Sequence, residues 1–126
     1  MVDVRDIADV AVAELLRRDH AASPLPRLTL DLAGPDQLTG ESVSAIWSAA
    51  LRREVRYGGS DLQAFEAQMA GWAPGWMAYD MRLMMACIQQ HGMKGSEESA
   101  QRVQALLGRP MRRYQDLVNE LVQATR

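Results

Sequence analysis

Three aspartates near the N-terminus are spaced in a way that could hold a metal ion. Asp3, Asp6 and Asp9 stand three residues apart, and a helix would bring their carboxylates roughly to one side. Negative charge in the first turn of a helix also complements the helix dipole, and Arg5 lies among the three. We therefore favour a stabilised helix N-terminus over a metal cluster.

Residues suited to other kinds of catalysis are sparse. His20 and His91 stand alone, without the spacing or the cysteine pair of a zinc site, which favours surface histidines. Cys87 falls on the apolar face of a predicted helix, where a thiolate is disfavoured. Gly58 and Gly59 lack the third glycine of a dinucleotide-binding loop. The sequence therefore predicts no catalytic, cofactor-binding or metal-binding residue.

The helix predicted over 74–91 carries the most information about binding. At about 100° per residue, its apolar side chains form two stripes that cover most of the helix. The stripes are Met77, Met81, Met84, Met85 and Ile88 on one side, and Trp76, Tyr79, Leu83, Ala86 and Cys87 on the other. We expect one stripe to pack in the core, and the other to meet more core, a partner chain or a small apolar ligand.

Seven residues of this region are candidates for a substrate pocket, because they combine aromatic or polarizable side chains with one carboxylate. They are Trp72, Trp76, Tyr79, Asp80, Leu83, Met84 and Cys87. Asp80 lies between the two stripes, where an unpaired charge would be costly, so we expect an arginine or a helix end as its partner, with ligand orientation as the alternative. For the Tyr79 hydroxyl, a bond to backbone is favoured over contact with a substrate.

The elements that position these residues are predicted to be mostly helical, in an α+β fold forming a single domain over 1–126. Apolar alternation predicts two or three short strands, at about 2–4, 28–32 and 55–57. Helical spacing, cap residues such as Thr39, Ser60 and Ser96, and glycine stops predict about six helices. Their ranges are about 5–18, 39–53, 60–71, 74–91, 96–107 and 113–125.

Composition limits the class of protein. A chain of 126 residues with 48% apolar content can bury one core. The formal net charge is -2 and the basic residues are scattered, which argues against nucleic-acid partners and anionic membranes. No apolar run reaches the roughly 18 residues that span a bilayer, one cysteine cannot form an internal disulfide, and the start lacks a secretion signal. We expect a soluble cytoplasmic protein.

Several segments together resemble the C-terminal part of NmrA-like proteins, which are atypical short-chain dehydrogenase/reductases. The segments are 2–11, 30–39, 53–57, 106–110 and 114–118. The resemblance implies an N-terminal Rossmann half that binds NAD(P), followed by this region as late strands and a helical cap over the substrate. That half is not in this sequence, so we expect no cofactor to bind this chain alone.

In such relatives the 28–32 strand joins the edge of the main sheet, which would leave an uncovered edge and apolar faces here. A homodimer or a Rossmann-bearing partner chain would cover them. The candidates for self-association are Leu28, Leu30, Leu32, Met77 and Met81. Two functions are therefore considered. We favour a non-catalytic binding or interaction module. The alternative is the C-terminal portion of an NAD(P)-dependent oxidoreductase, completed by another chain or by an upstream segment. The fold does not identify a substrate.

Overall fold

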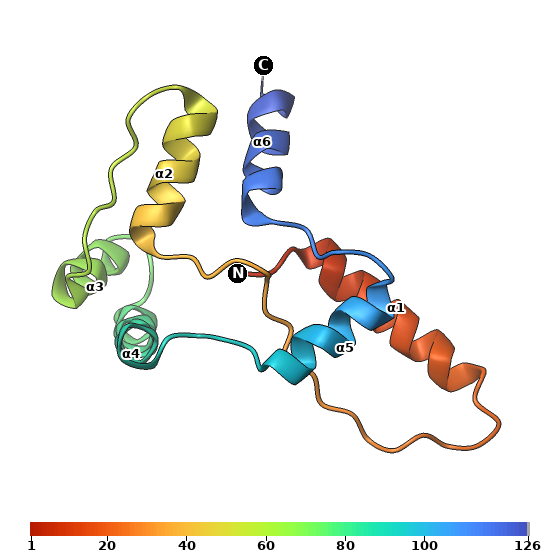
Figure 1. The fold of residues 1–126 in the computed structure, drawn as a ribbon. Helices are drawn as coiled ribbons and strands as arrows, with labels where there is room; N and C mark the ends of the chain where they lie inside the picture. The colour runs from red at the N-terminus through yellow and green to blue at the C-terminus, as the bar shows by residue number, and fades with distance from the viewer. Residues whose placement is uncertain (126) are drawn as a thin grey trace. The chain divides into compact units, whose positions relative to one another are not determined.

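The computed structural model describes residues 1–125, which form six α-helices joined by loops (Figure 1). The helices are α1 (Val4–Asp19), α2 (Gly40–Leu51), α3 (Leu62–Ala70), α4 (Gly75–His91), α5 (Glu97–Leu107) and α6 (Tyr114–Ala124). They belong to two compact units. The hairpin unit is Tyr57–Met93, and the main unit is Met1–Arg56 together with the segment from Lys94 onward. A single domain over 1–126 stays a prediction.

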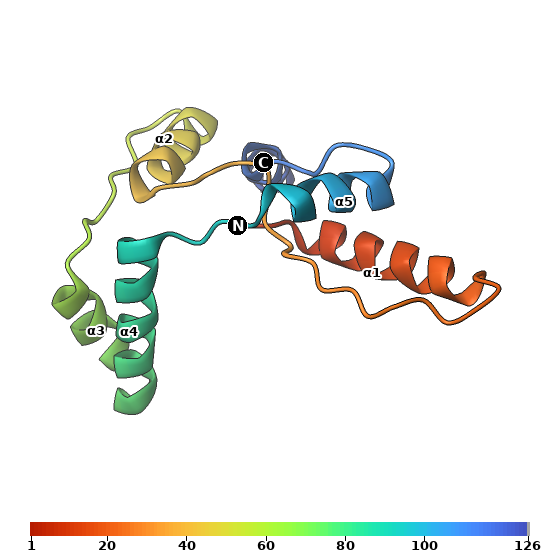
Figure 2. The ribbon, with the colours of Figure 1, turned by 60° about the horizontal axis from the view of Figure 1, so that its bottom comes forward.

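The predicted α+β class is wrong, because residues 1–125 contain no strand. The 2–4 segment leads directly into α1, since the Asp3 side chain caps that helix by accepting a hydrogen bond from the Arg5 backbone N–H at 2.8 Å. The 28–32 segment is extended in Figure 2, but no other strand lies beside it. A strand needs a hydrogen-bonding neighbour, so alternation alone does not produce one.

The third predicted strand, at 55–57, is an irregular loop, and its first residue, Val55, is held against α2. The Val55 backbone N–H donates to Ser48 Oγ at 2.9 Å, and that hydroxyl also bonds the Val55 carbonyl at 3.2 Å. A side chain on α2 therefore satisfies the backbone groups that a neighbouring strand would otherwise bind.

The helices agree with their predicted ranges to within two residues at every end. Thr39 and Ser96 are the N-caps of α2 and α5, as predicted, and Gly108 ends α5 in the left-handed region with φ of 62°. Helix α3 departs from the prediction, because Asp61 rather than Ser60 caps it. Local cap chemistry therefore accounts for these helix ends.

In the main unit, α1 packs against α5 and α2 packs against α6 (Figure 1). Val10 and Val103 are buried on α1 and α5, and Val118 is buried on α6. The Trp47 indole N–H donates to the Tyr114 hydroxyl at 3.0 Å, which ties α2 to α6. Few apolar residues of this unit are buried, so polar contacts such as the Trp47–Tyr114 bond help to define how its helices pack.

The hairpin unit consists of α3 and α4 lying side by side (Figure 2). Ala78 of α4 is fully buried, and Arg82 of α4 forms an ion pair with Glu66 of α3. The Gln89 side chain donates to the Ser60 carbonyl at 3.1 Å. One side of α4 thus packs against α3.

None of the helices over 1–125 is long and apolar enough to cross a bilayer.

Candidate functional site

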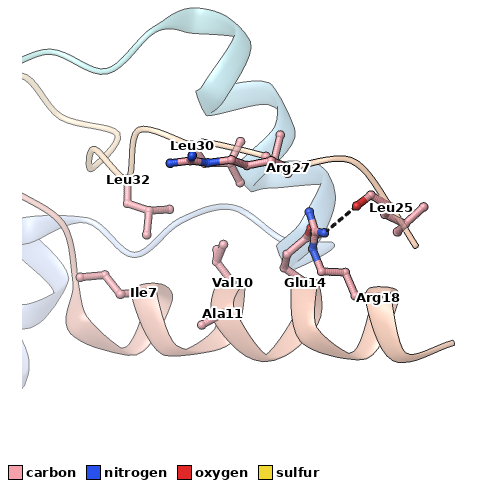
Figure 3. A pocket seen from close by; sticks show the side chains of 10 residues that line it. Ile7, Val10, Ala11, Glu14, Arg18, Leu25, Arg27, Leu30 and Leu32 are labelled. Carbon is pink, nitrogen blue, oxygen red and sulfur yellow. Dashed lines mark hydrogen bonds and ion pairs between the residues drawn. The ribbon is translucent and has the colours of Figure 1, made fainter. Parts of the chain in front are cut away.

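An apolar groove of about 580 Å³ lies in the main unit between α1 and the segment that follows it (Figure 3). We call it the α1 groove. It is lined by Ile7, Val10, Ala11, Leu25, Leu28, Leu30 and Leu32, with Glu14, Arg18 and Arg27. The alternation that predicted a strand therefore has a physical basis: Leu28, Leu30 and Leu32 line the groove, whereas Thr29 and Asp31 are exposed.

Two charged residues hold one end of the groove closed. Arg18 donates to the carbonyls of Leu25 and Pro26, at 3.2 and 2.9 Å, and so holds the segment that follows α1 against that helix. Glu14 accepts hydrogen bonds from Arg17 and Arg18, at 2.7 Å in each case. These bonds, of which the one from Arg17 has the larger effect, lower the pKa of Glu14 to about 2. Glu14 stays ionised at neutral pH and is not a general acid.

Helix α1 also carries an apolar stripe that no described residue of the main unit covers. Val4, Val12, Leu15 and Leu16 are exposed, Leu15 at 66%. They lie at helical spacing, so they form a continuous strip along one side of α1. Together with the α1 groove they make an uncovered apolar surface of the kind that marks protein contacts.

The N-terminal aspartates bind arginines of the loop between α5 and α6. The Asp6 side chain is fully buried and accepts from the Arg112 backbone N–H at 2.7 Å and from Arg109 Nη2 at 2.8 Å. Arg112 also donates a guanidinium N–H to Asp6, and both arginines pair with Asp9. Burial raises the pKa of Asp6, but these three bonds outweigh it, so the pKa lies below its ordinary value.

This Asp–Arg cluster, Asp6 and Asp9 with Arg109 and Arg112, is an anchor for the loop. No three metal-binding side chains converge among the described residues, and the Asp6 and Asp9 carboxylates already have cationic partners. The expectation of a stabilised helix N-terminus fits Asp3, the N-cap of α1, and Asp6 in its first turn, but it did not include the arginines that pair with Asp6 and Asp9. The cluster could not be predicted from a sequence pattern, because its partners lie 100 to 106 residues apart.

The side of α4 opposite α3 is exposed, and we call it the α4 face. Gln90 and His91 lie at its C-terminal end, and its other members are the six exposed residues Trp76, Tyr79, Asp80, Leu83, Met84 and Cys87. At about 100° per residue these six fall within an arc of about 140°. Met77 and Met81, predicted to self-associate, are instead half-buried on the side toward α3. The pocket candidates on α4 are thus brought together on one face, with Trp72 exposed in the preceding turn.

The polar groups of the α4 face differ from what the sequence predicted. Asp80 is exposed, and among residues 1–125 it has no ion pair or hydrogen bond, because solvent removes the need for one. The Tyr79 hydroxyl likewise makes no backbone bond within the described chain. Its ring lies under the Arg82 guanidinium, 4.9 Å from the centroid, while Arg82 pairs with Glu66. The α4 face therefore presents aromatic rings and one unpaired carboxylate, whereas the α1 groove presents mainly aliphatic side chains.

Comparison with known proteins finds one relevant similarity. Over 114 residues the chain is 32% identical to an NAD(P)H azoreductase of Xenophilus azovorans. The match takes in 90% of this chain but only 37% of the relative, so the chain spans little more than a third of that protein. No family model matches the chain. No solved structure matches it either.

Proposed function

We propose that the chain is the substrate-side part of an NAD(P)H-dependent oxidoreductase related to the NmrA-like proteins, and that it works with a nucleotide-binding part. The observation that carries this proposal is the similarity to an NAD(P)H azoreductase over 90% of the chain, which spans 37% of that relative. Cofactor binding then belongs to the portion of the relative that has no counterpart in this chain.

The α1 groove supports the proposal, because it offers a surface for the nucleotide-binding part. The 28–32 segment is extended, its leucines line the groove, and most of its backbone groups have no partner within residues 1–125. Asp31 is the exception, since its backbone N–H donates to Ser99 Oγ at 3.1 Å. An extended segment with free backbone groups can add to the edge of a sheet, and the exposed α1 stripe would be covered in the same step.

In this arrangement NAD(P)H supplies the hydride, and the chain's own residues bind and orient the substrate and exclude water. Glu14 is held ionised and Asp6 is held by arginines, so neither is proposed as a catalytic acid–base group. The substrate contacts we assign to this chain are the exposed side chains of the α4 face.

A reconstitution experiment tests the proposal. The chain is mixed with the separately produced nucleotide-binding part of the azoreductase relative, and complex formation is followed by light scattering, with NADPH oxidation measured in the presence of an azo compound. We expect a one-to-one complex and NADPH oxidation above that of either component alone.

Two neighbouring substitutions on opposite sides of the extended segment provide a matched pair. Leu30→Asp places a charge in the α1 groove and should abolish the complex, whereas Thr29→Asp faces solvent and should leave it intact. Circular dichroism confirms that both variants remain helical. The proposal fails if no complex forms, or if the two variants behave alike.

A non-catalytic, self-associating binding module is the second candidate, favoured by the uncovered leucines of the α1 groove. Light scattering of the chain alone, with and without NADPH, distinguishes it. A stable homodimer that ignores NADPH and does not recruit the nucleotide-binding part would support the module and argue against the oxidoreductase.

A further inference from the structure

We propose that the α4 face binds a planar aromatic cation. Trp76 is 67% exposed and stands four residues before Asp80 on the same side of the helix. Residues spaced in this way are surface neighbours, with about 5–6 Å between their Cβ atoms. A flat ring stacked on the Trp76 indole therefore brings a positive substituent within reach of the Asp80 carboxylate, and the indole itself attracts cations. Trp72, 72% exposed, adds a second indole in the preceding turn.

The charge distribution of the chain selects a cation over an anion. The hairpin unit contains three acidic residues, Asp61, Glu66 and Asp80, and one basic residue, Arg82. Its formal charge is thus -2, equal to that of the whole chain, and the main unit is formally neutral. Because Arg82 is paired with Glu66, the uncompensated charge on the α4 face is that of Asp80. An anion would meet repulsion there, and a cation attraction.

A second copy of the chain suits this face less well. A symmetric pairing of two α4 faces would bring together two hairpin units of formal charge -2, in each of which Arg82 is already paired with Glu66. The same rings and carboxylate are complementary to a small ligand that carries the opposite charge. This inference rests on the proposed function where it treats the bound cation as a substrate. The binding itself can be measured on the chain alone.

The test uses the indole N–H resonances of the tryptophans in ¹⁵N-labelled protein. The probes are trimethyl(1-naphthyl)ammonium and 1-naphthalenesulfonate, which share a ring system and differ in the sign of their charge. We expect the cation to shift the Trp76 and Trp72 resonances and to bind about threefold to tenfold more tightly than the sulfonate. The Trp47 resonance is an internal control, because its N–H is bonded to Tyr114 in the main unit.

Two charge substitutions identify the group responsible. Asp80→Asn should abolish the preference for the cation, and since Asp80 is exposed the helix content should not change. Asp19→Asn removes the same charge from an exposed position of the main unit and should leave the preference intact. The proposal is overturned if the two probes bind equally well, if Trp47 responds as strongly as Trp76, or if Asp19→Asn acts as Asp80→Asn does. No nucleotide-binding part is present in these samples, so their outcome does not depend on the reconstitution.

Discussion

Replacing Asp6 by asparagine tests whether one buried carboxylate holds the α5–α6 loop on α1. In the folded chain this side chain accepts from the Arg112 backbone N–H at 2.7 Å, from Arg109 Nη2 at 2.8 Å and from the Arg112 guanidinium. Asparagine has nearly the same shape, but it is neutral and replaces one acceptor oxygen by a donor. At least one of the three donors would then face another donor, and the arginines would lose their buried counter-charge.

The expected loss of stability follows from the burial and the number of bonds. A hydrogen bond to a charged group contributes about 1.5–3 kcal/mol, and breaking a buried ion pair costs about 3–5 kcal/mol. The Arg109 and Arg112 side chains are only about two-thirds buried and keep Asp9 and water as partners. We therefore expect Asp6→Asn to lower the free energy of unfolding by about 2–3 kcal/mol. Asp9→Asn should cost clearly less, because Asp9 is half exposed and binds the same arginines.

Urea unfolding followed by Trp47 fluorescence measures this loss. Substituting Trp72 and Trp76 by phenylalanine leaves Trp47 as the sole tryptophan, so the signal comes from the main unit that contains Asp6. Equal dependence of the free energy on urea in all variants would show that the same transition is compared. The reasoning is refuted if Asp6→Asn costs less than about 1 kcal/mol or no more than Asp9→Asn.

Two further predictions concern acid and the α2–α6 contact. Because the pKa of Asp6 in the folded chain lies below the unfolded value of 3.8, its contribution is complete at neutral pH and is lost as the pH falls below about 4. The difference in unfolding free energy between wild type and Asp6→Asn should therefore shrink in acid, and a constant difference would contradict the assignment. Tyr114→Phe removes the acceptor of the Trp47 indole N–H and should cost about 0.5–1.5 kcal/mol. Hydrogen exchange at that N–H should accelerate, and unchanged protection would show that the bond is not maintained in solution.

The helices could be predicted from sequence because their ends depend on local chemistry. Thr39 and Ser96 cap helices with their own side chains, and Gly108 ends α5 by adopting a conformation that other residues avoid. These interactions join residues a few positions apart, so they are visible in the sequence. The error at the start of α3 is of the same local kind, since Ser60 and Asp61 are both good caps and the carboxylate bonds two backbone N–H groups.

The predicted strands do not form among residues 1–125. A strand needs a neighbouring strand to bond with, and the pattern of a single segment does not show whether one is present. Alternating leucines at 28–32 indicate that one side of the segment is buried, and the α1 groove partly buries that side without a sheet. The Asp–Arg cluster was missed for a related reason, since Asp6 and Arg112 meet only through the tertiary fold.

For α4, the helical wheel separated two apolar stripes, but Met84, assigned to the stripe of Met77 and Met81, lies exposed on the α4 face, and the wheel could not decide which stripe α3 would cover. Met77 and Met81 lie toward α3, and Trp76 and Tyr79 lie away from it. The mistaken expectation of a partner for Asp80 came from assuming that both stripes were buried. Periodicity reports which residues share a side of a helix, and only packing reports which side is covered.

The two uncovered surfaces differ in charge, and that difference is the reason for proposing different partners for them. The α1 groove belongs to a formally neutral unit and is lined mainly by aliphatic side chains, so it selects by shape and area, as a protein interface does. The α4 face belongs to the unit that carries the net negative charge and combines aromatic rings with a free carboxylate, so it can select a small ligand by charge and stacking. A substitution in the groove should therefore change assembly without changing cation binding, and Asp80→Asn should do the reverse. If each substitution changed both properties, the two surfaces would have to act as one site, and the assignment of separate partners would be wrong.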